Sequence, residues 1–284
     1  MTRVIPPATT LSEAWLDTLE AVHLGGGTGL HVVTTVTSPD EWGHVDPVRL
    51  TEAIAEAAPK KRQGKVKSIE TVASTIFPED LYRHQALSWH PDLDEDAALE
   101  MDEAALELYE DYVDMLPVIA SDPATTWGST YFGRMVQWPV SAQPTNQLAW
   151  CIKYLRAQSK GHAGQANSAD LAIGGEGELA SVQIHRSNER RYFGGPCLVH
   201  VDLSVHDGKL NLLATYRHWH LVERAPGNLL GLSRLLRFLC EQTGYPLGEL
   251  TVVAGMANAQ HGDLGGKSGV AALIGSARQM QLTQ

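Results

Sequence analysis

Apolar residues recur every three or four positions in several segments of the chain, which is the spacing of one face of an α-helix. Thr10 or Ser12 can cap the first of these segments, because a hydroxyl accepts a hydrogen bond from a free N–H at a helix start. Gly244 follows the last segment, and glycine commonly ends a helix. The pattern predicts helices over residues 11–22, 47–58, 68–77, 98–116, 146–157 and 228–243.

Other segments alternate apolar and polar residues and are rich in β-branched side chains, which is typical of strands. The tetrapeptide HDGK at 206–209 favours a tight turn between two of them. The expected strands are residues 31–37, 198–205, 210–222 and 249–254. The expected irregular segments are GGGTG (25–29), KKRQGKVK (60–67), a Gly/Ala/Ser-rich loop or insertion at about 158–180, and a break at Pro226-Gly227. Together these elements predict the α+β class.

The net charge of −11 has a local origin. Residues 92–114 contain 11 acidic and no basic residues, so the rest of the chain is close to balanced. Leu99, Leu106, Leu108 and Val113 interrupt the acidic residues as in an amphipathic helix with a hydrated outer face, placed at about 92–116. Such acidity argues against duplex nucleic acid as a ligand, because binding to phosphates requires a basic surface.

The length of 284 residues with 43% hydrophobic and 19% charged content is ordinary for a globular protein. No apolar run approaches the roughly 20 residues that span a membrane. The N-terminal residues lack the apolar region of a secretory signal, so a cytoplasmic location is expected. We therefore expect neither a membrane nor a nucleic-acid partner.

Three cysteines are too few and too scattered for a disulfide framework or a zinc site. Cys151 and Cys240 fall on apolar helical faces, where a buried structural thiol is the expected role. Cys197 instead follows Gly194-Gly195-Pro196 and directly precedes a strand. It is the candidate nucleophile, because an accessible thiol at the edge of an element can react.

Two other patterns indicate chemistry less strongly. His218 and His220 share one face of a strand, a geometry that could bind a metal, but no third ligand has a helpful spacing, so no metal site is predicted. Gly265-Gly266-Lys267-Ser268 is similar to the end of a phosphate loop, but His261 occupies the position of the required earlier glycine.

The segment from Cys197 to about Gln260 carries an ordered series of motifs. A Pro-Cys step is followed by a strand, a DGKL turn, a second strand with Arg217 near its end, a Pro-Gly-Asn helix start and the segment TGYPLGEL. This order resembles the thymidylate synthase family over roughly residues 194–260. An upstream piece, WGSTYFGRMVQWP at 127–139, resembles another segment of that family.

The resemblance implies a single thymidylate synthase-like domain over residues 1–284, with a mixed β-sheet flanked by helices and a homodimer interface formed by the sheet. It implies one-carbon transfer to C5 of a pyrimidine nucleotide or nucleoside, by a methylase or a hydroxymethylase, with 5,10-methylenetetrahydrofolate as the cofactor. A cysteine thiolate adds to C6 and thereby makes C5 nucleophilic.

The resemblance also assigns roles to individual residues. The catalytic candidates are Cys197, Tyr131 and Glu70. The substrate-binding candidates are Arg217, His218, Asn228, Asn258 and Gln260, and His220 aligns with a cofactor contact. Asn228 favours a uracil-type base, because an amide pairs with N3–H and O4. Without the resemblance, the favoured role of Asn228 is a helix N-cap, because it follows Pro226-Gly227.

Several family positions differ in this chain. No arginine pair stands near Gly177-Glu178, although Arg186, Arg190 and Arg191 are close by in sequence, and no arginine precedes the loop at 25–29. A nucleoside or a differently phosphorylated substrate, as in modified-nucleoside metabolism, is therefore an alternative. Two further alternatives are pyrimidine chemistry by the same thiol without folate, and a non-catalytic nucleotide-binding relative.

Overall fold

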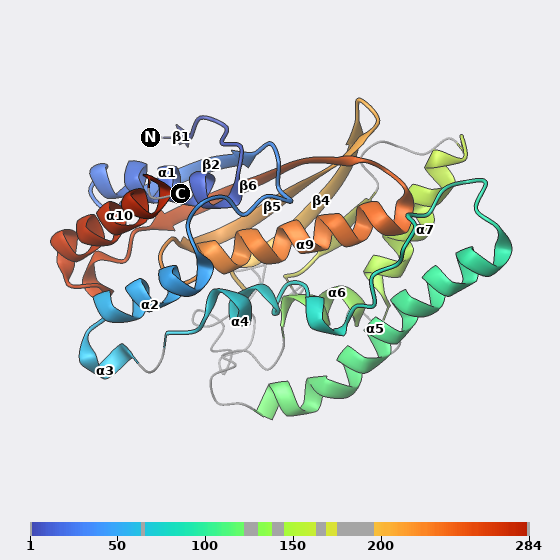
Figure 1. The fold of residues 1–284 in the computed structure, drawn as a ribbon, viewed down its shortest axis with the longest axis horizontal. Helices are drawn as coiled ribbons and strands as arrows, with labels where there is room; N and C mark the ends of the chain where they lie inside the picture. Colours follow the sequence, from blue (N-terminus) through green and yellow to red (C-terminus); the bar gives the residue numbers. More distant parts are fainter. Residues whose placement is uncertain are drawn as a thin grey trace, which may run out of the picture. The chain divides into compact units, whose positions relative to one another are not determined.

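Six strands form one mixed sheet in the computed structural model, which describes residues 2–63, 66–121, 130–137, 145–162, 169–174 and 196–282 (Figure 1). The strands are β1 (Thr2–Val4), β2 (Thr28–Val36), β3 (Ala169–Ala172), β4 (Leu198–His206), β5 (Lys209–His220) and β6 (Leu247–Asn258). They lie in the order β1-β2-β6-β5-β4-β3. The β1–β2 pair is parallel, whereas the β2–β6 and β3–β4 pairs are antiparallel. A mixed sheet flanked by helices confirms the α+β class.

The helices match most of the predicted segments. They are α1 (Leu11–Leu24), α2 (Pro47–Ala57), α3 (Lys60–Gln63), α4 (Ile69–Ala73), α5 (Glu95–Ser121), α6 (Tyr131–Val136), α7 (Gln147–Ser159), α9 (Ala225–Thr243) and α10 (Gly266–Leu282), with short 3-10 turns η1 (Glu79–Leu81) and η2 (His261–Asp263). Within the described residues, none of these helices combines the length and apolarity needed to cross a bilayer.

Three local predictions were wrong. The basic stretch predicted as a loop begins with α3, because lysine, arginine and glutamine all favour helices. The loop predicted at about 158–180 contains β3, which is too short for its alternation to stand out. Pro226-Gly227 was predicted as a break before the helix. Both residues instead lie in the first turn of α9, where proline has no intrahelical N–H bond to lose.

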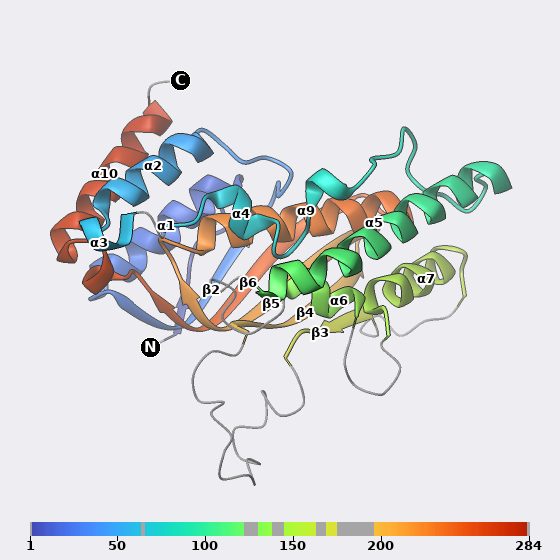
Figure 2. The same cartoon turned by 90° about the horizontal axis from the view of Figure 1, so that it is seen from below.

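The chain folds into two compact units, each built from separated segments. The first contains Met1–Ser74, Leu213–Arg234 and Gly248–Gln284, and the second contains Thr75–Leu212 and Leu235–Leu247. In the first unit, α1 packs against β2 and α10 (Figure 1, Figure 2).

Thr10 caps α1 as expected. Its hydroxyl accepts the Glu13 N–H at 3.4 Å, and the Glu13 carboxylate accepts the Thr10 N–H at 3.2 Å, which together form a capping box. The indole N–H of the fully buried Trp15 donates to the carbonyl of Leu221 at 2.7 Å. The Trp15 hydrogen bond fixes α1 against the turn that follows β5.

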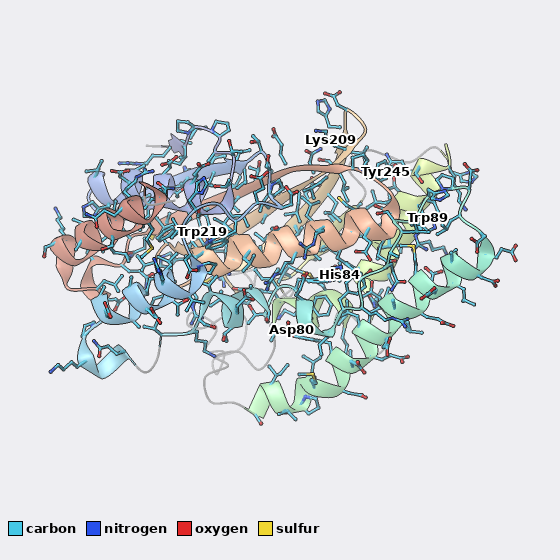
Figure 3. All side chains as sticks on the ribbon, in the orientation of Figure 1. Asp80, His84, Trp89, Lys209, Trp219 and Tyr245 are labelled. Atoms are coloured by element: carbon cyan, nitrogen blue, oxygen red, sulfur yellow. The ribbon has the colours of Figure 1, made fainter. Side chains whose placement is uncertain are left out.

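In the second unit, the Glu241 carboxylate on α9 binds the loop that contains Tyr82, His84 and Gln85. It accepts hydrogen bonds from the Tyr82 hydroxyl at 2.5 Å and from the Gln85 N–H at 2.9 Å, and it lies 3.1 Å from Nδ1 of His84. Figure 3 labels His84 and Trp89, and the Trp89 N–H donates to the Glu241 carbonyl at 2.8 Å. The loop therefore lies along the C-terminal half of α9.

The acidic segment forms α5, whose buried face differs from the one expected. Leu108 is buried, as predicted, but Leu99 and Leu106 are 56% and 53% exposed. The interpretation of these two leucines as part of an apolar face was wrong. The buried face is instead formed by side chains three or four positions apart, namely Met101, Ala104, Ala105, Leu108 and Tyr112.

Candidate functional site

Cys197 lies directly before β4, in the second unit. Its side chain is partly exposed, and the preceding Pro196 is buried. The other two thiols differ, because burial raises the pKa of Cys151 and of Cys240 to about 12. Both therefore remain protonated near neutral pH and are poor nucleophiles.

Tyr131 belongs to the same unit and is the first residue of α6. The Thr130 hydroxyl caps this helix by accepting the Gly133 N–H at 3.0 Å, which fixes the backbone at Tyr131. Residues 127–129 and 138–139 of the upstream motif lie outside the described residues, as do Arg186, Arg190 and Arg191.

Arg217 is exposed on β5, in the first unit. The strand buries every second residue up to Tyr216 and then buries Trp219, so its alternation changes phase around Arg217 and His218. A local irregularity of this kind redirects side chains, as β-bulges do near binding sites. Arg217 and the two histidines that follow are therefore presented by an irregular part of the strand.

His218 and His220 lie side by side, with ring centroids 4.4 Å apart, so the predicted shared face is confirmed. Burial lowers the pKa of His218, and burial together with the nearby His218 lowers the pKa of His220. Among the described residues, Nε2 of His218 and Nδ1 of His220 are buried without a hydrogen-bond partner. Such atoms are suited to bind a ligand or an ordered water, because a buried unpaired nitrogen is costly.

The lowered pKa values of His218 and His220 predict how stability depends on pH. Both groups bind protons more readily in the unfolded chain, near the ordinary value of 6.5, so their contribution is complete above that pH and is lost as the pH falls. We expect the free energy of unfolding to fall as the pH is lowered below about 6.5, and to fall less in the H218Q/H220Q variant. Urea unfolding at several pH values measures this.

The exposed His206, the last residue of β4, provides the control. H206Q should retain the wild-type pH profile. Equal slopes for the wild type and the H218Q/H220Q variant would contradict the prediction.

Asn228 is buried inside α9, with only 3% of its surface exposed. Because α9 begins at Ala225, the alternative that Asn228 caps this helix was wrong. Its backbone N–H donates to the Arg224 carbonyl at 2.8 Å, as in a helical turn. Its side-chain oxygen, Oδ1, accepts the indole N–H of Trp219 at 3.3 Å.

Asn258 and Gln260 lie at the end of β6 and close the turn after β5. The Asn258 carbonyl accepts the Leu221 N–H at 2.9 Å, and its Oδ1 accepts the Gln260 N–H at 2.6 Å. The buried Gln260 has a left-handed φ of 56°, and its Oε1 accepts the N–H groups of Val222 and Glu223 at 3.1 and 2.9 Å. The side-chain amide oxygen of Gln260 therefore positions the backbone that leads from β5 into α9.

Glu70 lies on α4 and forms a two-point ion pair with Arg234 of α9, at 2.7 and 3.1 Å. This geometry fixes the carboxylate more firmly than a single contact would. Sequence patterns gave no indication of the pair, because the partners are far apart in the chain. The Trp219–Asn228 contact was also missed, since a buried tryptophan in a strand is usually a core residue.

The predicted site residues divide between the two units. Cys197 and Tyr131 belong to the second unit, and all the other candidates belong to the first. Within the first unit, the turn after β5 brings together Trp219, Asn228, Asn258 and Gln260. Among the described residues, no group of three or more histidine, cysteine or acidic side chains could hold a metal ion.

No family model matches this chain. Two archaeal proteins named "Putative thymidylate synthase" are similar to part of it. The one from Methanosarcina barkeri is 32% identical and the one from Methanosarcina acetivorans is 34% identical, each over 59 residues. The match covers 21% of this chain and 27% of each relative, so it spans about a quarter of their length. The similarity is thus to two proteins of this name, over a limited segment.

Proposed function

We propose that the protein transfers a one-carbon unit to C5 of a uracil-type pyrimidine nucleotide, through a covalent bond between Cys197 and C6. The observation that carries this proposal is the Asn228 amide, which is buried on α9 and held in one orientation by the indole N–H of Trp219 on β5. The partial similarity to the two archaeal proteins supports it.

The chemistry assigns a task to each group. The Cys197 thiolate adds to C6, negative charge develops on O4, and C5 then attacks the one-carbon donor. C5 loses its proton as the donor departs, hydride or water then adds to the exocyclic methylene group, and the Cys197–C6 bond breaks to return the thiolate and release the product. Asn228 reads N3–H and O4 of the base and stabilises the developing charge with its N–H group. By the resemblance, Arg217 is assigned to the phosphate and Asn258 and Gln260 to the sugar, and Tyr131 is a further catalytic candidate. Glu70, kept in place by Arg234, is the candidate for positioning a water near the base.

A reduced folate, 5,10-methylenetetrahydrofolate, is the proposed one-carbon donor. The buried Nδ1 of His220, unpaired among the described residues, fits a hydrogen bond to a polar ring of this kind. The folate supplies the carbon unit when it is bound. His220 and His218 contribute neutral imidazoles, each with one donor and one acceptor nitrogen.

The test is release of tritium from C5-tritiated uridine and cytidine nucleotides, with and without methylenetetrahydrofolate, together with the mass of the product. Folate-dependent release from the uracil nucleotide is expected, and the product mass distinguishes methyl from hydroxymethyl transfer. Release without folate supports folate-independent chemistry by the same thiol. No release from any nucleotide or nucleoside would leave the non-catalytic alternative.

We also propose that the protein is a homodimer that pairs through the sheet. In the first unit, Leu30 and Met256 are paired across β2 and β6, and both are exposed, as is typical of an interface. The cross-strand neighbours Val33 and Val253 are partly exposed as well. Analytical ultracentrifugation at micromolar concentration is expected to give twice the mass of 30.9 kDa, and a monomer would refute the proposal.

A further inference from the structure

Trp219 on β5 fixes which way the Asn228 amide faces. The two side chains are buried, with 1% and 3% of their surface exposed, and the indole Nε1 lies 3.3 Å from Oδ1 of Asn228. An indole N–H only donates a hydrogen bond, whereas an amide has one face that accepts and one that donates. The atom facing Trp219 must therefore be the oxygen, and the NH2 group of Asn228 points elsewhere.

The structure holds both partners rigidly. The Trp219 ring stacks on Tyr216, with centroids 5.9 Å apart and planes 27° apart. Asn228 is fixed by α9, and a side chain at the preceding Gly227 would meet Val72 and the Ile69 carbonyl at 2.5 and 2.6 Å. Both side chains are buried, Trp219 against Tyr216 and Asn228 on a helix that approaches α4 closely at Gly227, so the hydrogen bond lies within packed surroundings.

We propose that Trp219 is a positioning residue that locks the Asn228 amide and thereby makes the site select uracil over cytosine. This inference rests on the proposed function, in which Asn228 reads the base. Uracil presents a donor at N3 and an acceptor at O4, and cytosine presents the reverse at N3 and N4. A free amide serves either base by rotating by half a turn.

The indole N–H removes that freedom. After rotation, the Asn228 NH2 group would face the Trp219 N–H, donor against donor, and a buried hydrogen bond would be lost. The locked orientation leaves the second lone pair of Oδ1 for N3–H of uracil and an N–H of Nδ2 for O4. With cytosine, the acceptor N3 would face the acceptor Oδ1 of Asn228, and the donor amino group at N4 would face the donor Nδ2.

The variant W219F tests this, because phenylalanine keeps an aromatic ring and removes the N–H. Deoxyuridine and deoxycytidine monophosphates are titrated into each protein by calorimetry. We expect the wild type to favour the uracil nucleotide, and the ratio of the two dissociation constants to fall by about tenfold in W219F, which corresponds to about 1.4 kcal/mol.

W15F is the matched control. It also loses one buried indole hydrogen bond, the 2.7 Å bond to the Leu221 carbonyl, but it leaves Asn228 untouched. W15F should keep the wild-type ratio. The positioning role of Trp219 is overturned if the ratio of the two dissociation constants is the same in the wild type and W219F, or if it falls equally in W219F and W15F. Either result leaves the proposed function standing. A wild type that binds neither nucleotide overturns the proposed function, and this inference with it.

A second measurement does not depend on the folding of a variant. In a crystal structure of the wild type with deoxyuridine monophosphate, Nδ2 of Asn228 should lie within hydrogen-bond distance of O4, with Oδ1 still facing the Trp219 indole. Loss of the Trp219–Asn228 contact in that complex would falsify the inference.

Discussion

Replacing Cys197 by serine is expected to lower tritium release from C5 by at least about a thousandfold. Attack on C6 requires an anionic nucleophile, and a serine hydroxyl loses its proton far less readily than a thiol. Serine differs from cysteine by one atom, so the fold and nucleotide binding should be retained. The measurement is release from C5-tritiated deoxyuridine monophosphate, together with calorimetric binding of the same nucleotide.

C240S is the control for this prediction. Burial raises the pKa of Cys240 to about 12, so its thiol should not take part in the reaction and release should continue. C151S should act through stability, because its thiol is buried in α7. Wild-type release from the Cys197 variant would exclude the covalent mechanism.

Replacing Gly244 by alanine is expected to destabilise the protein by about 3 kcal/mol. Gly244 ends α9 with a left-handed φ of 76°, which costs a residue with a side chain about 1–2 kcal/mol. A Cβ there would also lie 2.1 Å from the Trp89 carbonyl oxygen, so the backbone at Trp89 would have to move. That shift would strain the 2.8 Å bond from the Trp89 N–H to the Glu241 carbonyl.

Urea unfolding measures the change, and Gly275 provides the matched control. Gly275 lies inside α10 with an ordinary φ, and a Cβ there would meet nothing within 4 Å. G275A should stabilise the helix by about 0.5–1 kcal/mol, since alanine favours helices over glycine. Equal effects of the two substitutions would show that the collision at Trp89 is absent.

Features encoded within a few residues could be predicted from the sequence. The Thr10 cap and the Gly244 helix end follow from short-range rules, and both are present. The turn at Asp207-Gly208 has φ values of 50° and 75°, as a tight hairpin turn requires. The shared face of His218 and His220 follows from the two-residue period of a strand.

Features that depend on distant residues could not be predicted. The roles of Trp219 and Arg234 become visible only when β5, α4 and α9 are placed together. The early start of α9 was missed because Pro226-Gly227 is typical of both a break and a first helical turn. The candidate site was predicted through the order of its motifs, which fixes positions in the chain but not hydrogen bonds.

The pairing of β2 with β6 has a consequence for how the protein is made. Thr28 pairs with Asn258, so β2 leaves the ribosome long before its antiparallel partner is synthesised. Pairings between distant segments form slowly, and an unpaired strand can associate with other chains in the meantime. The nascent protein therefore spends most of its translation with that edge of β2 unpaired, and β2 can associate with other chains until β6 has been synthesised.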